Sequence, residues 1–123
     1  MEYRCITNNP IMVDSEFHNV EFKSVDNLDL FLWIEGEVCK GYRLLTHPLT
    51  GSIRPDISPY KSVLLSKNTA EIDNESIELI HKAIDYTYSL AANHKKPDWR
   101  KEEREDFQFV DRSFIRYALE LNQ

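Results

Sequence analysis

Alternating hydrophobic and polar positions open the chain, and this pattern predicts a strand over Tyr3 to Thr7. Asn8, Asn9 and Pro10 follow as a turn, because asparagine tolerates left-handed geometry and proline lacks a ladder donor. Further short apolar stretches predict strands around Val20 and Phe22, over Tyr42 to Thr46 and over Ser62 to Ser66.

Apolar residues at helical spacing predict the remaining elements. A first helix is expected over about Leu28 to Lys40, with Asp26 or Asn27 as its N-cap and Gly41 at the C′ position. A second helix is expected from a cap at Asp73 or Asn74 to about Asn93, with an apolar face formed by Ile77, Ile80, Ile84 and Ala91. A third is expected over about Asp111 to Leu121.

The order of these elements is strand, strand, helix, strand, loop, strand, helix, helix. A helix between strands favours a parallel strand–helix–strand unit, and 123 residues suit one domain. We therefore expect residues 1–123 to form a single three-layer α/β domain. Its small, mostly parallel sheet should have about four strands, accompanied by about three helices.

Charge and composition limit the partners and the cell compartment that we expect for this chain. The formal charge of −6 argues against a nucleic-acid partner, because a phosphate backbone would be repelled on average. The longest apolar run, Leu30 to Ile34, is far below the roughly 18 residues of a membrane span, and no membrane partner is expected. The first residues lack the apolar region of a secretory signal, which favours the cytoplasm. Cys5 and Cys39 are too sparse for a zinc site or a dithiol, and we expect both to be buried structural thiols.

The polar loop from Thr46 to Pro59 is the best candidate for a binding surface. It begins where a buried strand should end, and ligands of parallel α/β sheets bind at such ends. Its donors suit an anion or a carboxylate, and they come from Thr46, His47, Thr50, Gly51, Ser52 and Arg54. The alternative is an ordered connection, stiffened by its three prolines, whose hydroxyl groups bond to their own backbone.

Asn8 and Asn9 extend this hypothesis. If the strands that end at Thr7 and Thr46 run parallel, the two asparagines share a sheet edge with His47 and Thr50, and all four could bind one ligand. Simple turn formation is the competing interpretation of the asparagine pair.

An enzymatic reading is weaker. His47 could act as a general base in a small hydrolase or transferase, with Asp56 as the nearest carboxylate and Thr50 or Ser52 holding an oxyanion. No complete triad supports it, and we lean against an enzyme. No histidine spacing suits a metal, and the loop lacks a Walker motif, so neither a metal nor a cofactor is expected.

Two stretches offer interaction surfaces. Phe31 and Trp33 lie in the first predicted helix and are expected in the core or an interface. Residues 95–106, which include Trp99, mix both charge signs, which is typical of a solvated face and less often of a docking surface.

Three motifs resemble one known family. TNNP at 7–10, GYRLLTHPLTGSIRP at 41–55 and PYKS at 59–62 are similar to the small GrdX proteins, and the likeness is specific over the first half of the chain. The resemblance implies a cytoplasmic accessory role beside the glycine, sarcosine and betaine reductases of anaerobic amino-acid-fermenting bacteria. It implies no mechanism and assigns no catalytic residue. The expected partners are a small anionic metabolite or a reductase subunit.

Overall fold

The computed structural model of the protein describes residues 2–13, 16–49, 54–55, 57–93 and 98–121. Within these ranges the chain forms three strands, one short 3-10 helix and three α-helices. The strands are β1 (Tyr3–Thr7), β2 (Val20–Phe22) and β3 (Ser62–Ser66), and the 3-10 helix is η1 (Pro10–Val13). The α-helices are α1 (Asn27–Cys39), α2 (Asn74–Asn93) and α3 (Lys101–Leu121).

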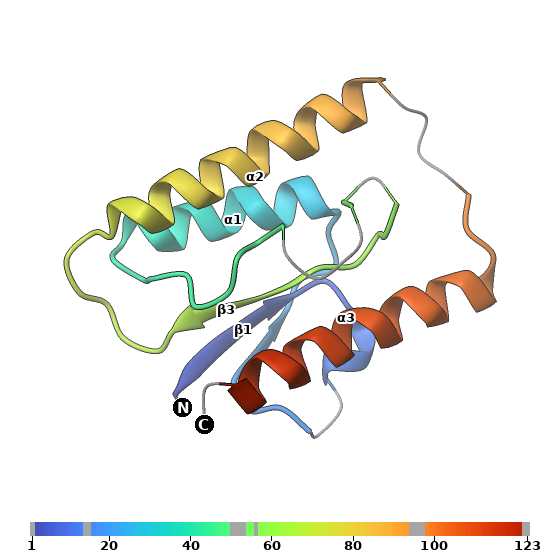
Figure 1. The fold of residues 1–123 in the computed structure, drawn as a ribbon, viewed down its shortest axis with the longest axis horizontal. Helices are drawn as coiled ribbons and strands as arrows, with labels where there is room; N and C mark the ends of the chain where they lie inside the picture. The colour runs from blue at the N-terminus through green and yellow to red at the C-terminus, as the bar shows by residue number, and fades with distance from the viewer. Residues whose placement is uncertain (1, 14–15, 50–53, 56, 94–97, 122–123) are drawn as a thin grey trace.

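The elements form layers around the sheet, with α1 and α2 on one side and α3 on the other (Figure 1). One core cluster joins Ile6 of β1 to Leu30 of α1 and Ile80 of α2. A second joins Cys5 of β1 to Met12 of η1 and Ile115 of α3. Adjacent residues of β1 thus pack on opposite faces, as strand alternation requires. The expected layered α/β arrangement is present.

The sheet itself differs from the expectation of about four mostly parallel strands. Its order is β2-β1-β3; β1 pairs parallel with β2 and antiparallel with β3, over a longer register. After α1, the segment 43–46 forms an antiparallel bridge to β3, and the described residues between them contain no helix. Such a loop return places the two segments antiparallel. Because 43–46 runs in the same direction as β1, β3 is antiparallel to β1 as well. The mostly parallel sheet was therefore a wrong prediction.

The predicted strand Tyr42 to Thr46 is reduced to one isolated antiparallel bridge between Leu44 and Leu65. Side-chain hydroxyls take two of the ladder positions here. The Ser66 Oγ accepts from the Arg43 backbone N–H at 2.8 Å, and the Thr46 Oγ1 accepts from the Leu64 N–H at 3.0 Å. Two backbone hydrogen bonds of 2.8 Å remain between the segment 43–46 and β3, from the Leu45 N–H to the Leu64 carbonyl and from the Ser66 N–H to the Arg43 carbonyl. The side-chain bonds lie beside these two, where a longer strand would continue its backbone ladder.

The ends of α1 form as their local sequence predicts. The Asp26 side chain accepts a hydrogen bond from the Asp29 backbone N–H, which makes Asp26 the N-cap. Gly41 has a φ of 108° and donates to the Val38 carbonyl, while the Tyr42 N–H donates to Glu37. These two bonds complete a Schellman motif, which closes the helix.

The third helix begins at Lys101, ten residues before the predicted start at Asp111. The charged residues before Asp111, which led the sequence pattern to miss this start, form ion pairs that stabilise it. Glu103 accepts from the Arg100 backbone N–H at 3.1 Å and also pairs with its guanidinium, as in a capping box. Lys101 and Glu105 form a second ion pair one turn apart.

Arg4, near the start of β1, links this strand to β2 and to α1. Its guanidinium donates to both Glu21 carboxylate oxygens and to Glu37, over 2.6 to 2.8 Å, and lies 4.4 Å from the ring centroid of Tyr42. The hydrogen bond to Glu21 and, secondarily, the one to Glu37 raise the pKa of Arg4 against the opposing effect of burial. These contacts account for the arginine as a structural cross-link.

Candidate functional site

The carboxyl end of β1 and the start of β3 form one edge of the sheet, and this edge is rich in buried polar groups. β1 and the segment 43–46 both lie antiparallel to β3, so they run in the same direction and end at this edge. The shared direction that a common site for Asn8 and His47 requires is therefore present.

Asn8 is buried and cross-links three parts of the chain. Its Nδ2 donates to the Asn27 Oδ1 and the Val25 carbonyl at 3.0 Å and to the Pro59 carbonyl at 3.3 Å, and its Oδ1 accepts from the Lys61 backbone N–H at 2.8 Å. Both ends of its amide bond to protein groups, so Asn8 holds the edge together.

Asn27, at the start of α1, continues this cross-link. Its Nδ2 donates to the carbonyl oxygens of Pro55 at 3.1 Å and Ser58 at 2.9 Å. We name the pair Asn8 and Asn27 the asparagine clamp. The clamp fixes the described part of the loop between Arg54 and Lys61 against β1 and α1, which pre-orders the backbone there.

Asn9 points to the opposite face of the sheet, as alternation from Asn8 requires. Its Nδ2 donates to the Gln108 carbonyl at 2.9 Å and to the Asp111 Oδ2 at 3.0 Å, and its Oδ1 accepts from the Ile11 N–H. Asn9 thus anchors α3 to the end of β1 and, like Asn8, has protein partners at both ends of its amide.

Asp111 is the acceptor at the centre of this second network. The Ser62 Oγ donates to its Oδ2 at 2.6 Å, and Ser62 also shares a 2.7 Å hydrogen bond with the Thr7 hydroxyl. Burial raises the pKa of Asp111, although the hydrogen bonds from Ser62 and Asn9 and the charge of Lys61 oppose the rise.

Lys61 joins the asparagine clamp to the Asp111 network. It is only 4% exposed, and burial lowers its pKa while the nearby charge of Asp111 raises it. It precedes Ser62 and shares the parity of Val63 and Leu65, which pack under α1 and α2. Alternation therefore places the Lys61 side chain on the same face of the sheet as that cluster, against which Leu49 of the loop also packs.

Thr46 and His47 have local contacts. The Thr46 hydroxyl accepts from the Leu64 N–H, as described above, and thereby pairs the loop start with β3. His47 is exposed, and its Nδ1 accepts from the Leu49 backbone N–H at 3.1 Å. This bond places the proton of a neutral imidazole on Nε2. In the described ranges no carboxylate contacts this imidazole.

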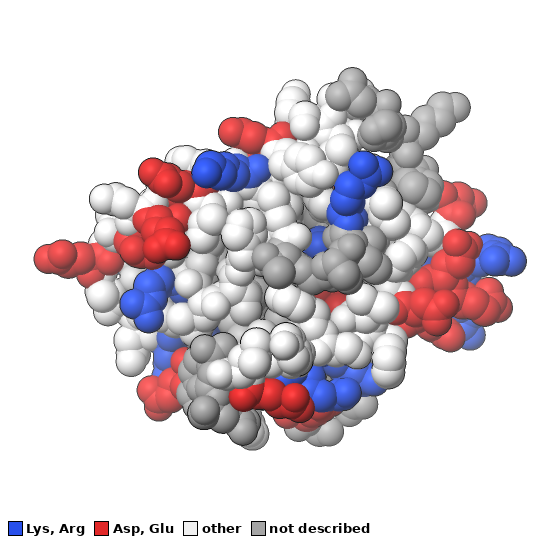
Figure 2. Space-filling view, in the orientation of Figure 1, with Lys and Arg blue, Asp and Glu red and all other residues white. Residues whose placement is uncertain are grey.

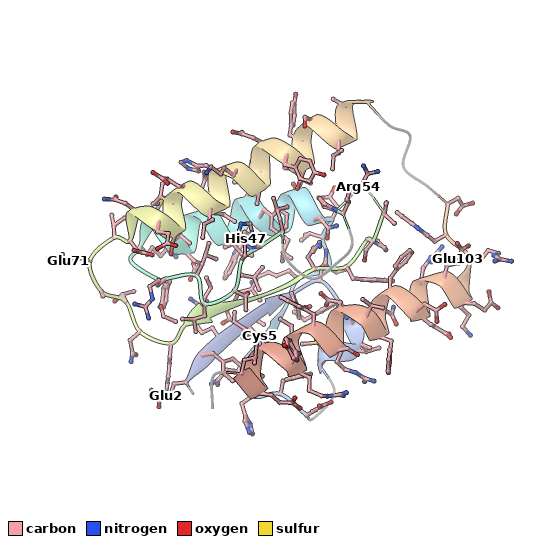
Figure 3. The ribbon with its side chains drawn as sticks, in the orientation of Figure 1. Glu2, Cys5, His47, Arg54, Glu71 and Glu103 are labelled. Atoms are coloured by element: carbon pink, nitrogen blue, oxygen red, sulfur yellow. The ribbon has the colours of Figure 1, made fainter. Side chains whose placement is uncertain are left out.

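Arg54 is exposed at the other end of the loop, and its carbonyl accepts from the N–H groups of Ile57 and Ser58. Figure 3 shows His47 and Arg54 on the side of the fold that carries α1 and α2, whereas Cys5 lies toward α3. The predicted site residues Thr50, Gly51 and Ser52, and the carboxylate candidate Asp56, lie outside the described residues.

Four residues of this polar edge were not predicted as site residues from the sequence: Asn27, Lys61, Ser62 and Asp111. Lys61 and Ser62 lie in the PYKS motif, so the motif itself pointed to the right segment. A charged residue inside the apolar pattern of the predicted last helix was the available signal for Asp111, since charges are seldom buried without a partner.

The two cysteines differ in their surroundings. Cys5 is buried, and desolvation raises its pKa to about 12, which makes it an inert thiol. Cys39 is exposed, contrary to the prediction, because it faces outward at the last position of α1.

Trp33 and Trp99 are both half-buried: Lys23 lies over the Trp33 ring, and Trp99 packs edge-on against Phe107.

Within the described part of the chain, no group of three or more histidine, cysteine, aspartate or glutamate side chains could hold a metal ion. The helices in that same part are too short or too polar to cross a membrane.

The geometry therefore defines a small layered α/β protein in which a polar loop is clamped against one buried edge of the sheet. The family model of GrdX-like proteins matches residues 4–120, and the chain belongs to this family. Neither a curated protein nor a solved structure matches the chain.

Proposed function

We propose that this protein is a non-catalytic accessory component of an amino-acid reductase system of the glycine, sarcosine or betaine type. We further propose that it binds a small anionic ligand through the 46–59 loop, in which the asparagine clamp holds Pro55, Ser58 and Pro59. Membership of the GrdX-like family supports the first part of the proposal. The position of two cationic residues, Arg54 and Lys61, at the ends of the clamped segment supports the second.

The observation that carries the ligand proposal is the position of Arg54, an exposed guanidinium beside a backbone that the asparagine clamp holds at Pro55 and Ser58. Arginine suits a carboxylate or a phosphate group because its planar guanidinium can donate two parallel hydrogen bonds. Lys61, of which only 4% is exposed, adds a second basic residue at the same sheet edge.

The asparagine clamp explains how such a site would be ordered before a ligand binds. Carbonyl oxygens of Pro55, Pro59 and Ser58 are held by Asn8 and Asn27, so the backbone near Arg54 is ordered before a ligand arrives. Pre-ordering lowers the entropy cost of binding. The two asparagines thus support the site from behind instead of binding the ligand themselves.

Thermal-shift measurements with glycine, sarcosine, betaine, acetyl phosphate and inorganic phosphate test the proposal. A ligand at 100 times its Kd should stabilise the fold by about 2.7 kcal/mol. Arg54→Ala should remove most of that shift, since Arg54 is exposed and its loss leaves the core intact.

Arg43→Ala is the matched control. Arg43 is also exposed, and its removal changes the net charge by the same amount at the opposite end of the 43–46 segment. The proposal fails if none of the five compounds shifts the melting temperature, or if Arg43→Ala and Arg54→Ala reduce the shift equally.

The competing hypothesis, a hydrolase or transferase with His47 as general base, makes a different prediction. Turnover of a phosphoester or acyl substrate that His47→Ala abolishes, with the fold retained, would establish it. The contact of His47 with the Leu49 N–H instead gives the ring a role in ordering the start of the loop.

A further inference from the structure

The outward face of α3 carries three large apolar side chains that the fold does not cover. Phe109 is 55% exposed, Tyr117 59% and Leu121 66%. They are separated by eight and four residues and therefore follow one side of the helix. The opposite side, with Asp111, Ile115 and Ala118, is buried against the sheet and η1.

Ser113 lies midway between Phe109 and Tyr117, four residues from each. Its Oγ donates to the Phe109 carbonyl at 2.9 Å, so its polar group is satisfied within the helix. A small, satisfied side chain between two aromatic rings lets another backbone approach closely. We name Phe109, Ser113, Tyr117 and Leu121 the α3 stripe.

Acidic residues flank the α3 stripe on the same face. Glu102, Asp106 and Glu120 are exposed and fall within about 20° of Ser113 around a helix of 3.6 residues per turn. The neighbouring Glu103 and Glu105 are paired with Arg100 and Lys101. In the described ranges no ion pair to Glu102 or Asp106 is found, whereas the charge of Glu120 contributes to the raised pKa of Arg116, one turn away. Acidic side chains gather at the end of the molecule where α3 begins (Figure 2).

We propose that the α3 stripe is a docking surface for a basic amphipathic helix of a partner protein. The apolar centre would be buried by the partner's apolar side chains, and its lysines or arginines would meet Asp106 and Glu120. These two acids are 14 residues apart, which corresponds to about 21 Å along a helix. The partner's basic groups should have a similar spacing.

Charge argues against a second copy of this chain as the occupant. An antiparallel pair of α3 helices centred on Ser113 would match Phe109 with Tyr117, but it would also place Asp106 opposite Glu120 twice. A parallel pair would place each acid opposite itself. Like charges held together in an interface disfavour both arrangements, and the net charge of −6 adds to the repulsion.

Fluorescence anisotropy with a labelled synthetic helix tests the proposal. The probe is a leucine-faced peptide of about 20 residues with lysines 14 positions apart, which suits one helix face. The wild-type chain should bind it, and a peptide with the same leucines and glutamates in place of the lysines should not bind. The double variant Phe109→Ser, Tyr117→Ser should weaken binding at least about tenfold, as expected for central aromatic contacts.

Charge variants separate docking from general attraction to an acidic protein. Asp106→Lys and Glu78→Lys both change the net charge by +2, but Glu78 is an exposed residue of α2. Asp106→Lys should weaken binding and Glu78→Lys should leave it within about twofold. Equal effects of these two variants, or no loss in the aromatic double variant, would overturn the proposal.

Two further measurements complete the test. Light scattering that shows a wild-type dimer, converted to a monomer by Phe109→Ser, would assign the stripe to self-association and overturn the proposal. Arg54→Ala should leave peptide binding unchanged, so the failure of this inference is distinguishable from the failure of the anion site. Circular dichroism melting should show that the exposed substitutions leave the fold intact.

Discussion

Asn9 and Asp111, which lie 102 positions apart in the sequence, are joined by a 3.0 Å hydrogen bond between Nδ2 and Oδ2. This bond anchors α3 to the end of β1, and Ser62 adds β3 to the same carboxylate oxygen. The last helix is therefore attached by a buried polar contact as well as by the apolar cluster around Ile115.

Removal of the Asp111 carboxylate should destabilise the fold. Asp111→Ala leaves two buried donors, from Asn9 and Ser62, without their acceptor, and we expect a loss of about 2–4 kcal/mol in the free energy of unfolding. Asp111→Asn retains an amide oxygen that can accept from both donors and should cost less. Urea denaturation of the two variants measures the difference, and equal losses would contradict this account of the network.

The pH dependence of Asp111 gives a second prediction. Burial raises the pKa of Asp111 in the folded state. Its contribution to stability is therefore present below the unfolded pKa of about 3.9 and is lost as pH rises above it. The stability of Asp111→Asn relative to the wild type should increase from about pH 4 upward. Parallel pH profiles for the two proteins would rule this out.

The asparagine clamp should show energetic coupling. Asn8→Ala and Asn27→Ala each leave buried backbone groups unpaired, and each should cost about 1–3 kcal/mol. Since the two side chains bond to each other, a double-mutant cycle should give a coupling energy of at least about 0.5 kcal/mol. Hydrogen exchange in residues 57–61 should also accelerate. The exposed Asn68 is the control, since Asn68→Ala should alter neither quantity.

Replacement of Gly41 or Gly36 by alanine should change the stability of the fold in opposite directions. Gly41 has a φ of 108°, and an added Cβ would meet the Ala70 carbonyl oxygen, so Gly41→Ala should destabilise by more than about 1 kcal/mol. Gly36 lies within α1, where an added Cβ meets nothing within 4 Å. Gly36→Ala should stabilise by about 0.5–1 kcal/mol. Thermal or urea melting decides both, and a neutral Gly41→Ala would contradict the Schellman geometry.

The two cysteines should differ in reactivity. Cys39 is exposed and should react with iodoacetamide at pH 8, whereas desolvation raises the pKa of Cys5 to about 12 and should protect it. Mass spectrometry should find one label on the native chain and two on the unfolded chain.

Alkaline pH tests the same thiol through stability. A raised folded pKa means that the contribution of Cys5 is present below its unfolded pKa, near 8.5, and is lost as pH rises toward about 12. The wild-type stability should therefore fall relative to Cys5→Ala between about pH 9 and 12. A constant difference between the two proteins across this range would show that the thiol is not desolvated.

Local elements followed from the sequence because their determinants lie within a few residues. Asp26 caps α1 through Asp29, and Gly41 closes that helix through Val38. The Asp73 side chain likewise accepts from the Ser76 N–H and begins α2. The early start of α3 was missed, although its ion pairs are also local, because the six charged residues from Lys101 to Asp106 show no hydrophobic period.

The roles within the candidate site depended on contacts between distant parts of the chain. The strand end after Thr7 was predicted, and with it the presence of Asn8 and Asn9 at a polar edge. Apart from the local bond between Asn9 and Ile11, the partners of their side chains lie 17 to 102 residues away. The sequence pattern therefore did not reveal that one asparagine clamps the loop and the other anchors α3.

The sequence by itself determined the α/β layering, the caps of α1 and α2 and the location of the polar loop, since each depends on local spacing and residue type. Only the tertiary structure decided the antiparallel return into β3, the burial of Lys61 at the polar sheet edge and the exposure of the α3 stripe. These features arise when separate elements pack, because burial and side-chain hydrogen bonding depend on which surfaces meet.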